Sequence, residues 1–224
     1  MALTDMLPVA ECFSSIQGEG ANTGIPMVFL RVAGCNLSCA FCDTDHSCKE
    51  SWQIPDLYAH ILGLAGNPES AYKIEWVCLT GGEPTLYIRQ LVSLIAALKR
   101  SFKKICIETN GTNFLPFKYQ HKDFSKLYMR GEVFDWITVS PKRDSELCKQ
   151  TLRLADEWKV VIEDASDIKR VEELGEKFRY YDTMPIYLQP VDNNREVALM
   201  AIEACKYHRN WRLSVQVHKF LGLR

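Results

Sequence analysis

The stretch GCNLSCAFCDTD, residues 34–45, places Cys35, Cys39 and Cys42 in a C-x3-C-x2-C pattern. A cubane [4Fe–4S] cluster is held by cysteine thiolates. Three protein ligands leave one iron open, which a simple electron carrier does not need but a substrate or cofactor can use. The spacing therefore favours a catalytic iron–sulfur cluster.

Zinc is the alternative metal for these thiols. Structural zinc takes four closed ligands, commonly from two paired C-x2-C knuckles. A second knuckle is absent, and the nearby candidates for a fourth ligand are His46 and Cys48. Inert buried thiols are a third possibility, but the neighbouring "NLS" and "DTD" are loop residues rather than core residues.

Length and composition predict one globular domain over residues 1–224. The chain is 47% hydrophobic and 25% charged, with a formal net charge of −1. Without a clustered positive surface, a nucleic acid is not expected as a partner. No apolar run approaches ~18 residues, so no membrane is expected either. The N-terminus lacks a signal peptide and the nine cysteines are an odd number, so we expect a cytoplasmic protein without a disulfide framework.

Short β-rich runs alternate with helix-period runs, which predicts an α/β fold with a parallel sheet and right-handed crossovers. Because a complete eight-fold (β/α) barrel takes ~250 residues, we expect an open, partial (β/α) barrel of about six units. Residues 111–134 lack helical periodicity and are assigned no role. Predicted strands are 26–33, 74–80, 104–108, 135–139, 158–162, 185–189 and 212–217; predicted helices are 55–65, 87–101, 144–155, 165–178 (opening on Ser166) and 193–208.

Three further motifs come directly after predicted strands, as the cysteine motif does. "TGGEPTL" occupies residues 80–86, "ETNG" residues 108–111 and "SPK" residues 140–142. The carboxyl ends of strands are where a barrel-like fold builds its site. Together with C-x3-C-x2-C after the first predicted strand, these motifs resemble those of the radical S-adenosylmethionine (SAM) superfamily.

Other stretches resemble one family within that superfamily, the 7-carboxy-7-deazaguanine synthases of queuosine-type 7-deazapurine biosynthesis. They are "SIQGEGANTGIPMVFLRVAGCN" (15–36), "CDTDH" (42–46) and "VQVHKFLGLR" (215–224). The resemblance spans nearly the whole chain. It implies a truncated barrel and a homodimer.

The resemblance also implies a reaction, the ring contraction of 6-carboxy-5,6,7,8-tetrahydropterin to 7-carboxy-7-deazaguanine with release of ammonia. SAM binds the open iron and is cleaved to a 5′-deoxyadenosyl radical, which takes hydrogen from C6 of the pterin. The cofactors carry this chemistry and the protein supplies placement. A flavodoxin- or ferredoxin-type electron donor is expected, and the final deazapurine product stays open.

Site residues follow from the resemblance, position by position. Cys35, Cys39 and Cys42 ligate the [4Fe–4S] cluster. Thr44 matches the magnesium ligand, and a hydroxyl suits an ion that prefers oxygen. The SAM-binding set is Phe41, Cys42, Asp43, Gly82, Glu83, Ser140, Pro141 and Lys142.

The substrate-binding set is Ile16, Gln17, Gly18, Glu19, Arg31, Thr80 and Arg224. Arg31 interrupts an apolar strand, where an unpaired charge is costly, so it is either a partner for the substrate carboxylate or one half of a structural salt bridge. Arg224 would present the terminal carboxylate to the pterin. His218 and Lys219 are expected to be structural.

Two other functions remain possible at this stage. A radical SAM activase shares the three-cysteine spacing but is not expected to share "QGEG" before it or "CDT" at its end. A non-catalytic zinc or iron–sulfur module would bind metal and ignore SAM. Whether Cys48 is ever a ligand also stays open.

Overall fold

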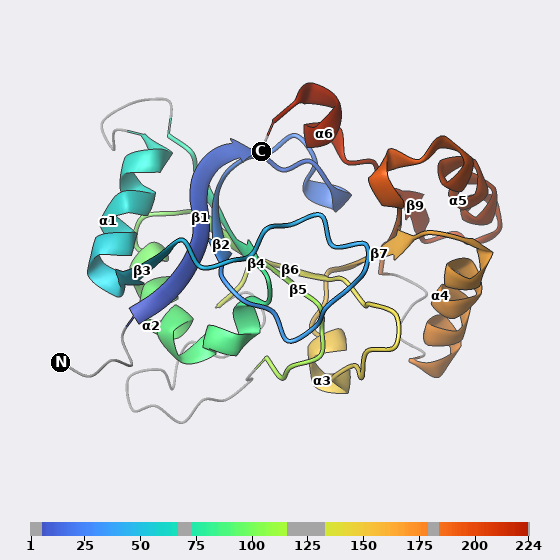
Figure 1. Cartoon of the computed structure of the whole chain (residues 1–224), viewed down its shortest axis with the longest axis horizontal. Coiled ribbons are helices and arrows are strands. Elements are labelled where there is room, and N and C mark those ends of the chain that lie inside the picture. The colour runs from blue at the N-terminus through green and yellow to red at the C-terminus, as the bar shows by residue number, and fades with distance from the viewer. Residues whose placement is uncertain (1–5, 67–72, 116–132, 179–183, 224) are drawn as a thin grey trace. The chain divides into compact units, whose positions relative to one another are not determined.

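The computed structural model describes residues 6–66, 73–115, 133–178 and 184–223 (Figure 1). The chain divides into two compact units. The first comprises residues 1–15, 26–109 and 113–137, and the second residues 16–25, 110–112 and 138–224.

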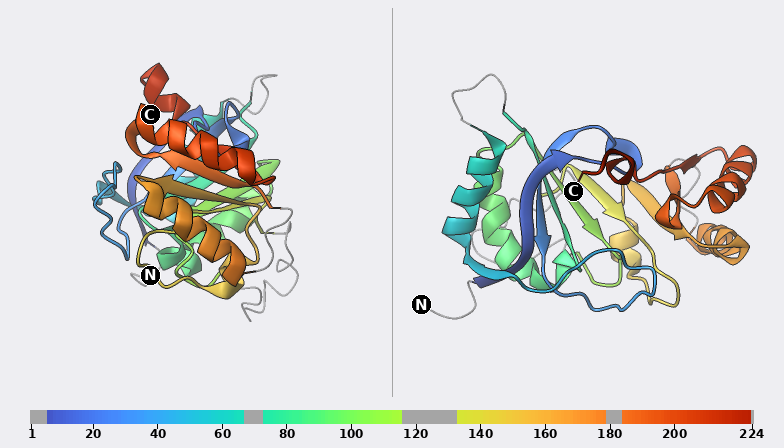
Figure 2. Two further views of the ribbon diagram at one scale, coloured as in Figure 1. Left: turned by 90° about the vertical axis from the view of Figure 1, so that its right-hand side faces the viewer. Right: turned by 45° about the horizontal axis from the view of Figure 1, so that its top comes forward.

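The first unit is a mixed sheet with the strand order β3-β1-β2-β4-β5. Strands β1 and β3 are antiparallel, while β2, β4 and β5 are parallel. Helices α1 and α2 lie side by side next to these strands (Figures 1 and 2). The elements are β1 (Met6–Ile16), β2 (Pro26–Val32), β3 (Glu50–Gln53), α1 (Ile54–Ala65), β4 (Trp76–Gly81), η3 (Pro84–Tyr87), α2 (Ile88–Leu98) and β5 (Lys104–Thr109), with β6 (Trp136–Val139) beginning in this unit.

Apolar periodicity explains how this unit packs. The α2 stripe of Leu91, Leu94, Ile95 and Leu98 is almost entirely buried, as the i, i+3, i+4, i+7 pattern predicts. Parallel strands are covered on both faces and so read as continuous apolar runs, which is why β2 and β4 were readily predicted.

The second unit continues from the end of β6 through parallel pairs β6–β7, β7–β8 and β8–β9. Its helices α4 and α5 lie side by side in both views of Figure 2. Trp158 on β7 is 1% exposed and meets the Phe178 ring edge-on. The elements are η2 (Gly20–Asn22), α3 (Lys149–Leu152), β7 (Glu157–Ile162), α4 (Ala165–Lys177), β8 (Ile186–Pro190), η4 (Val191–Asn193), α5 (Arg195–Tyr207), β9 (Trp211–Leu213) and α6 (Val217–Leu221).

Several sequence predictions of elements are wrong in detail. Strands β1 and β3 were missed, so the cysteines follow β2 rather than the first strand. The predicted helix 144–155 is reduced to α3, because Asp144 has a φ of +55° and the Cys148 amide bonds the Gly111 carbonyl at 2.9 Å. The predicted strand 212–217 ends at Leu213, and helix α6 follows.

The start of α4 also differs from the prediction. Its N-cap is Asp164, whose carboxylate accepts from the Ser166 amide at 2.7 Å. Most of the unassigned segment 111–134 lies outside the described residues. Within the described residues, none of the helices has the length and apolar character needed to cross a bilayer.

Candidate functional site

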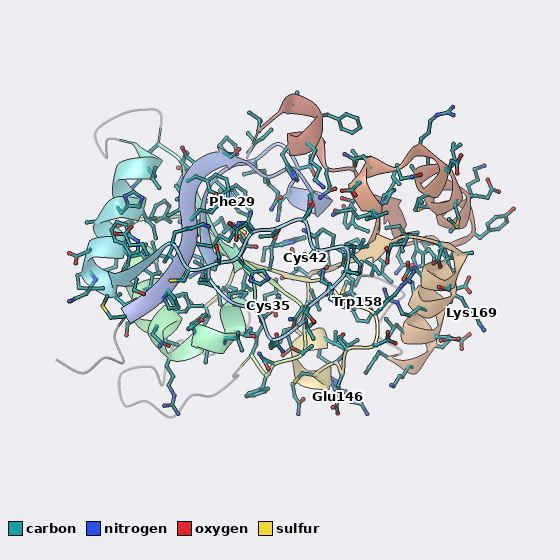
Figure 3. The ribbon with its side chains drawn as sticks, in the orientation of Figure 1. Phe29, Cys35, Cys42, Glu146, Trp158 and Lys169 are labelled. Carbon is teal, nitrogen blue, oxygen red and sulfur yellow. The ribbon has the colours of Figure 1, made fainter. Side chains whose placement is uncertain are left out.

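Cys35, Cys39 and Cys42 lie on one loop of the first unit, between β2 and β3. Cys35 and Cys42 are labelled in Figure 3. The Gly34 amide donates to the His46 carbonyl at 2.8 Å and closes the base of the loop, while the Cys42 amide donates to the Cys39 carbonyl at 3.1 Å. Cys35 and Cys39 are half-buried and Cys42 is exposed. The thiols are therefore presented on irregular backbone at the carboxyl end of a parallel strand.

The loop beyond Cys42 is braced by a carboxylate. Asp45 accepts from the Ser47 amide at 2.9 Å and from Lys49 Nζ at 2.7 Å. The hydrogen bond from Lys49 is the main reason that the pKa of Asp45 lies below its ordinary value. Thr44 Oγ1 donates to Asp43 Oδ1 at 3.3 Å, so the predicted magnesium ligand sits beside a carboxylate.

The turn after β4 packs directly onto the entry to this loop. The Gly82 amide donates to the Val32 carbonyl at 3.1 Å and the Glu83 amide to the Gly34 carbonyl at 2.9 Å. A Cβ on Gly82 would lie 1.9 Å from the Gly34 carbonyl oxygen and 3.0 Å from the Cys35 nitrogen. The cysteine loop and the turn Gly81–Glu83 (the GGE turn) are far apart in sequence, but their backbones pack directly on each other.

Glu83 is fully buried, and its carboxylate holds the turn in place through hydrogen bonds. Its Oε1 accepts from the Thr85 amide at 3.0 Å, from Thr85 Oγ1 at 2.5 Å and from Thr109 Oγ1 at 2.7 Å. A buried carboxylate needs such donors. Glu83 thus links the GGE turn to the end of β5, where "ETNG" begins.

Arg31 and Thr80 are register partners on the adjacent parallel strands β2 and β4. Arg31 Nε donates to Glu11 Oε1 at 2.7 Å, and Thr80 Oγ1 donates to Glu108 Oε2 at 3.1 Å. The structural salt bridge expected as one possibility for Arg31 is present. A guanidinium has five N–H donors, so this pair does not preclude a second carboxylate.

In the second unit, Ile16 is the last residue of β1, and Gln17 and Gly18 begin the loop that follows it. The Gln17 amide donates to the Ile25 carbonyl at 2.8 Å, and the Gly24 amide returns to the Gln17 carbonyl at 2.7 Å. The Gly18 carbonyl accepts from the Val217 amide at 3.0 Å. This loop is therefore closed on itself and joined to the start of α6.

His218 covers the bare face of Gly18. A Cβ on Gly18 would lie 2.1 Å from His218 Nδ1, so the imidazole occupies the space that a side chain would need. His218 and Lys219 were both expected to be structural, and Lys219 Nζ donates to Asp192 Oδ1 at 3.1 Å.

The "SPK" segment follows β6 in the same unit. Ser140 and Pro141 are buried. Ser140 Oγ donates to the Lys159 carbonyl at 2.7 Å, and Lys142 Nζ donates to Ser140 Oγ at 2.8 Å. The segment is thus held against β7.

Glu19 is surrounded by donors from separate elements of the second unit. Its carboxylate accepts from Lys159 Nζ, from Gln189 Nε2 at 3.1 Å and from Gln216 Nε2 at 2.9 Å. Burial by itself would raise the pKa of Glu19, but the Lys159 ammonium, hydrogen bonds from Lys159 and Gln216 and the positive charge of His218 hold that pKa below its ordinary value.

Comparisons with known proteins agree with these motifs. The Radical SAM superfamily profile matches residues 30–198. A 7-carboxy-7-deazaguanine synthase from Bacteroides thetaiotaomicron is 36% identical over 98% of this chain and 100% of its own length, and one from Escherichia coli K12 is 32% identical over 96% and 98%. The crystal structure of QueE from Escherichia coli superposes with a TM-score of 0.75 at 31% identity, covering 95% of each chain.

The chain belongs to the 7-carboxy-7-deazaguanine synthase family of radical SAM enzymes. Its fold is the open, partial (β/α) barrel of that superfamily, as predicted. Its cofactors are a [4Fe–4S] cluster, SAM and Mg²⁺.

The donor set of this chain fits the cluster. Cys35, Cys39 and Cys42 supply thiolates from one loop, the ligand type that iron–sulfur clusters require. In the part of the chain that the structure describes, no three candidate ligand side chains converge on one point. Each thiolate of a cubane binds a different iron, so the three sulfurs need not meet at one point, and the fit rests on donor chemistry.

The structure places most of the predicted site residues but does not assign their ligands, so those roles stay predictions. Arg224 lies outside the described residues. Residues that sequence reasoning missed include Glu11, Glu108, Thr109, Lys159, Gln189 and Gln216. Lys159 inside the apolar run WKVVI was an available signal, because a lysine there needs a buried partner.

Proposed function

We propose that this chain converts 6-carboxy-5,6,7,8-tetrahydropterin to 7-carboxy-7-deazaguanine, with ring contraction and release of ammonia. The observation that carries the proposal is the three-thiol loop anchored on the GGE turn through Gly34. It occurs in a chain that matches 7-carboxy-7-deazaguanine synthases over nearly its full length.

Residues of the first unit are assigned to the cofactors. Cys35, Cys39 and Cys42 would hold the cluster, which supplies the electron for reductive cleavage of SAM. The backbone of Phe41 and Asp43 would contact SAM, and Gly82 and Glu83 would hold its methionine end. The Glu83 carboxylate, which accepts from Thr85 and Thr109, would also fix the conformation of the turn after β4.

Magnesium is assigned to Thr44. Mg²⁺ keeps several waters and takes few protein ligands, so one hydroxyl on an exposed loop is a sufficient protein contribution. The remaining oxygen ligands would come from water and from the substrate carboxylate. Asp43, hydrogen-bonded to Thr44, would orient the hydroxyl.

The pterin is assigned to the loop Ile16–Glu19, with Arg31 and Thr80 as further contacts. A loop closed by its own main-chain bonds offers fixed polar groups for a planar heterocycle. Arg31 would pair with the substrate carboxylate while keeping its bond to Glu11. Ser140, Pro141 and Lys142 would line SAM, and Arg224 would reach the pterin.

Partners and surroundings are part of the same proposal. We expect a flavodoxin- or ferredoxin-type electron donor, a homodimer and a cytoplasmic location, with neither nucleic acid nor membrane as a partner. These follow from the family resemblance and from the composition of the chain.

Anaerobic turnover tests the proposal. Protein with a reconstituted cluster is given SAM, Mg²⁺, dithionite and 6-carboxytetrahydropterin, and the products are identified by mass spectrometry. We expect 7-carboxy-7-deazaguanine from the natural chain and none from Cys39→Ala, because an iron ligand is lost. Cys106→Ala, a buried thiol in β5, is the matched control and should retain product.

The other outcomes separate the two halves of the proposal. Formation of 5′-deoxyadenosine without any deazapurine would keep the radical SAM chemistry and reject the pterin substrate. A fully loaded cluster that cleaves no SAM would reject both.

A further inference from the structure

Lys159 is a buried lysine in the middle of an apolar strand. Its side chain is 8% exposed, and its neighbours Trp158 and Val160 on β7 are 1% and 0% exposed. A buried ammonium is destabilising unless it is paired and hydrogen-bonded. The sequence therefore keeps a costly residue at this position, and its contacts indicate why.

The ammonium of Lys159 reaches the loop assigned to the pterin. It donates to Glu19, and the Gln189 and Gln216 side chains complete the shell around the same carboxylate. The loop after β1, strands β7 and β8 and the segment before α6 thus meet at one group. Glu19 directly follows Gly18, so this shell sets where the Gly18 backbone lies.

The main chain of the same residue holds the segment assigned to SAM. The Lys159 carbonyl accepts from Ser140 Oγ at 2.7 Å, and Ser140 in turn accepts from Lys142. One residue of β7 is therefore bonded to both assigned segments. Its side chain holds the pterin loop and its backbone holds SPK.

A second, independent attachment keeps the loop folded. Glu157 lies two residues before Lys159, so both side chains point to the same face of β7. Its Oε2 accepts from the Ala21 amide at 2.9 Å and its Oε1 from Thr138 Oγ1 at 2.8 Å. Replacing Lys159 therefore leaves the loop tied at Ala21 and alters its position only near Glu19.

We infer that Lys159 is a positioning residue: through Glu19 it holds the Ile16–Gly18 backbone in the geometry that accepts the pterin. The inference rests on the proposed function of that loop. Lys159 acts through Glu19 rather than on the reacting atoms, so its loss weakens substrate binding before it slows the chemistry.

The electrostatics around Glu19 provide a signature of this role. The groups that face Glu19 are Lys159, His218, Gln189 and Gln216. Without the Lys159 ammonium, burial raises the pKa of the Glu19 carboxyl. Below that pKa the neutral Glu19 acid can remain beside a methionine. Above it, the buried carboxylate lacks its ammonium partner and is drawn toward water, although Gln189 and Gln216 still donate to it. The defect of Lys159→Met therefore grows as pH rises.

Kinetics and hydrogen exchange of the reconstituted protein test the inference. For Lys159→Met we expect KM for the pterin to rise at least about tenfold, with kcat, KM for SAM and the cluster absorption nearly unchanged. Amide exchange over residues 16–22 should accelerate by about tenfold, with α4 and α5 unchanged. Lys159→Arg should restore part of the binding.

The matched control is Lys206→Met. Lys206 pairs with Glu203 on the exposed surface of α5, with 63% of its side chain exposed, so this variant should match the natural chain in every readout. The double variant Lys159→Met/Glu19→Gln removes both charges and should bind the pterin better at high pH than Lys159→Met does. It also keeps the test open if Lys159→Met folds poorly.

Three results would overturn the inference: unchanged KM and exchange in Lys159→Met, a loss confined to kcat, or strictly additive effects of Lys159→Met and Glu19→Gln. Hydrogen exchange needs no turnover. If the natural chain makes no deazaguanine, the proposed function fails while the Lys159–Glu19 coupling is still measured.

Discussion

At the scale of single residues, two glycines determine how the cysteine loop is held. Gly81 has a φ of +141°, which L side chains rarely adopt. Gly82 packs its Cα against the Gly34 peptide, with no room for a methyl group. A turn against which a second backbone packs this closely requires glycine, because the Cβ of any other residue would overlap that backbone.

Gly82→Ala should therefore displace the backbone just before Cys35. We expect iron content per chain and turnover both to fall sharply, and the free energy of unfolding to fall by about 2 kcal/mol. Iron analysis and chemical denaturation measure these effects. Gly63→Ala is the control: it lies in α1 with nothing within 4 Å of the added Cβ, and should stabilise the fold by about 0.5–1 kcal/mol. Normal iron loading in Gly82→Ala would contradict the close packing.

At the scale of elements, the start of α4 is tied to the residue that follows SPK. Arg143 donates to Asp167 at 2.5 and 2.8 Å and to Asp164 at 3.0 Å. Asp167 is 1% exposed and also accepts from the Glu163 amide at 2.8 Å. Burial alone would raise the pKa of Asp167, but Arg143 and the Glu163 amide lower it below its ordinary value.

This pair makes a pH-dependent contribution to stability. A carboxyl whose pKa is lower in the folded chain stabilises it above the unfolded value of about 3.9, and the contribution disappears as pH falls through the folded pKa. Asp167→Asn should lower the free energy of unfolding by about 2 kcal/mol at pH 7, and the difference from the natural chain should vanish toward low pH.

Urea denaturation across pH 7 to pH 2 checks the dependence. Glu173→Gln is the control on the same helix, because its pair with Lys169 is largely exposed and surface pairs contribute little. A difference between Asp167→Asn and the natural chain that stays constant with pH would show that Asp167 acts by shape rather than charge.

The strands that were predicted correctly are mainly those buried on both faces of the sheet. Strands β2, β4, β5, β7 and β8 read as apolar runs and α2 as a regular stripe. The prediction failed at β9, where a three-residue strand gives way to Ser214 and Gln216. These side chains bond Gln189, the Gly20 amide and Glu19 instead of continuing the ladder. Such distant polar partners leave no periodic signal.

At the scale of the whole molecule, motif spacing predicted the family, the open barrel and the cofactors. The single-domain organisation stays a prediction. The polar shell around Glu19 was not predictable, because it joins residues 19, 159, 189 and 216, and no local pattern specifies contacts at such separations. Arg31 shows the opposite case: a charge inside an apolar strand signalled a partner, although not Glu11 in particular.

Cluster loading should change the two units unequally. A cluster held by Cys35, Cys39 and Cys42 ties three positions of one irregular loop together, so binding iron should restrict that backbone. We expect amide exchange over residues 35–48 to slow by about tenfold or more on reconstitution, while β7, β8 and β9 show no change. Mass spectrometry of the iron-free and reconstituted protein, with Cys39→Ala treated identically, measures this. Equal slowing in Cys39→Ala would indicate that the iron binds elsewhere.

The shared Gly34 peptide has a practical consequence for protein engineering. Its amide is bonded to His46 and its carbonyl to Glu83, so the cysteine loop and the GGE turn cannot be transplanted separately. A chimaera that takes residues 33–49 from one relative and residues 80–86 from another would join two segments that did not evolve to pack on each other. Loop grafting, directed libraries and minimal cluster-binding peptides should therefore transfer both segments together.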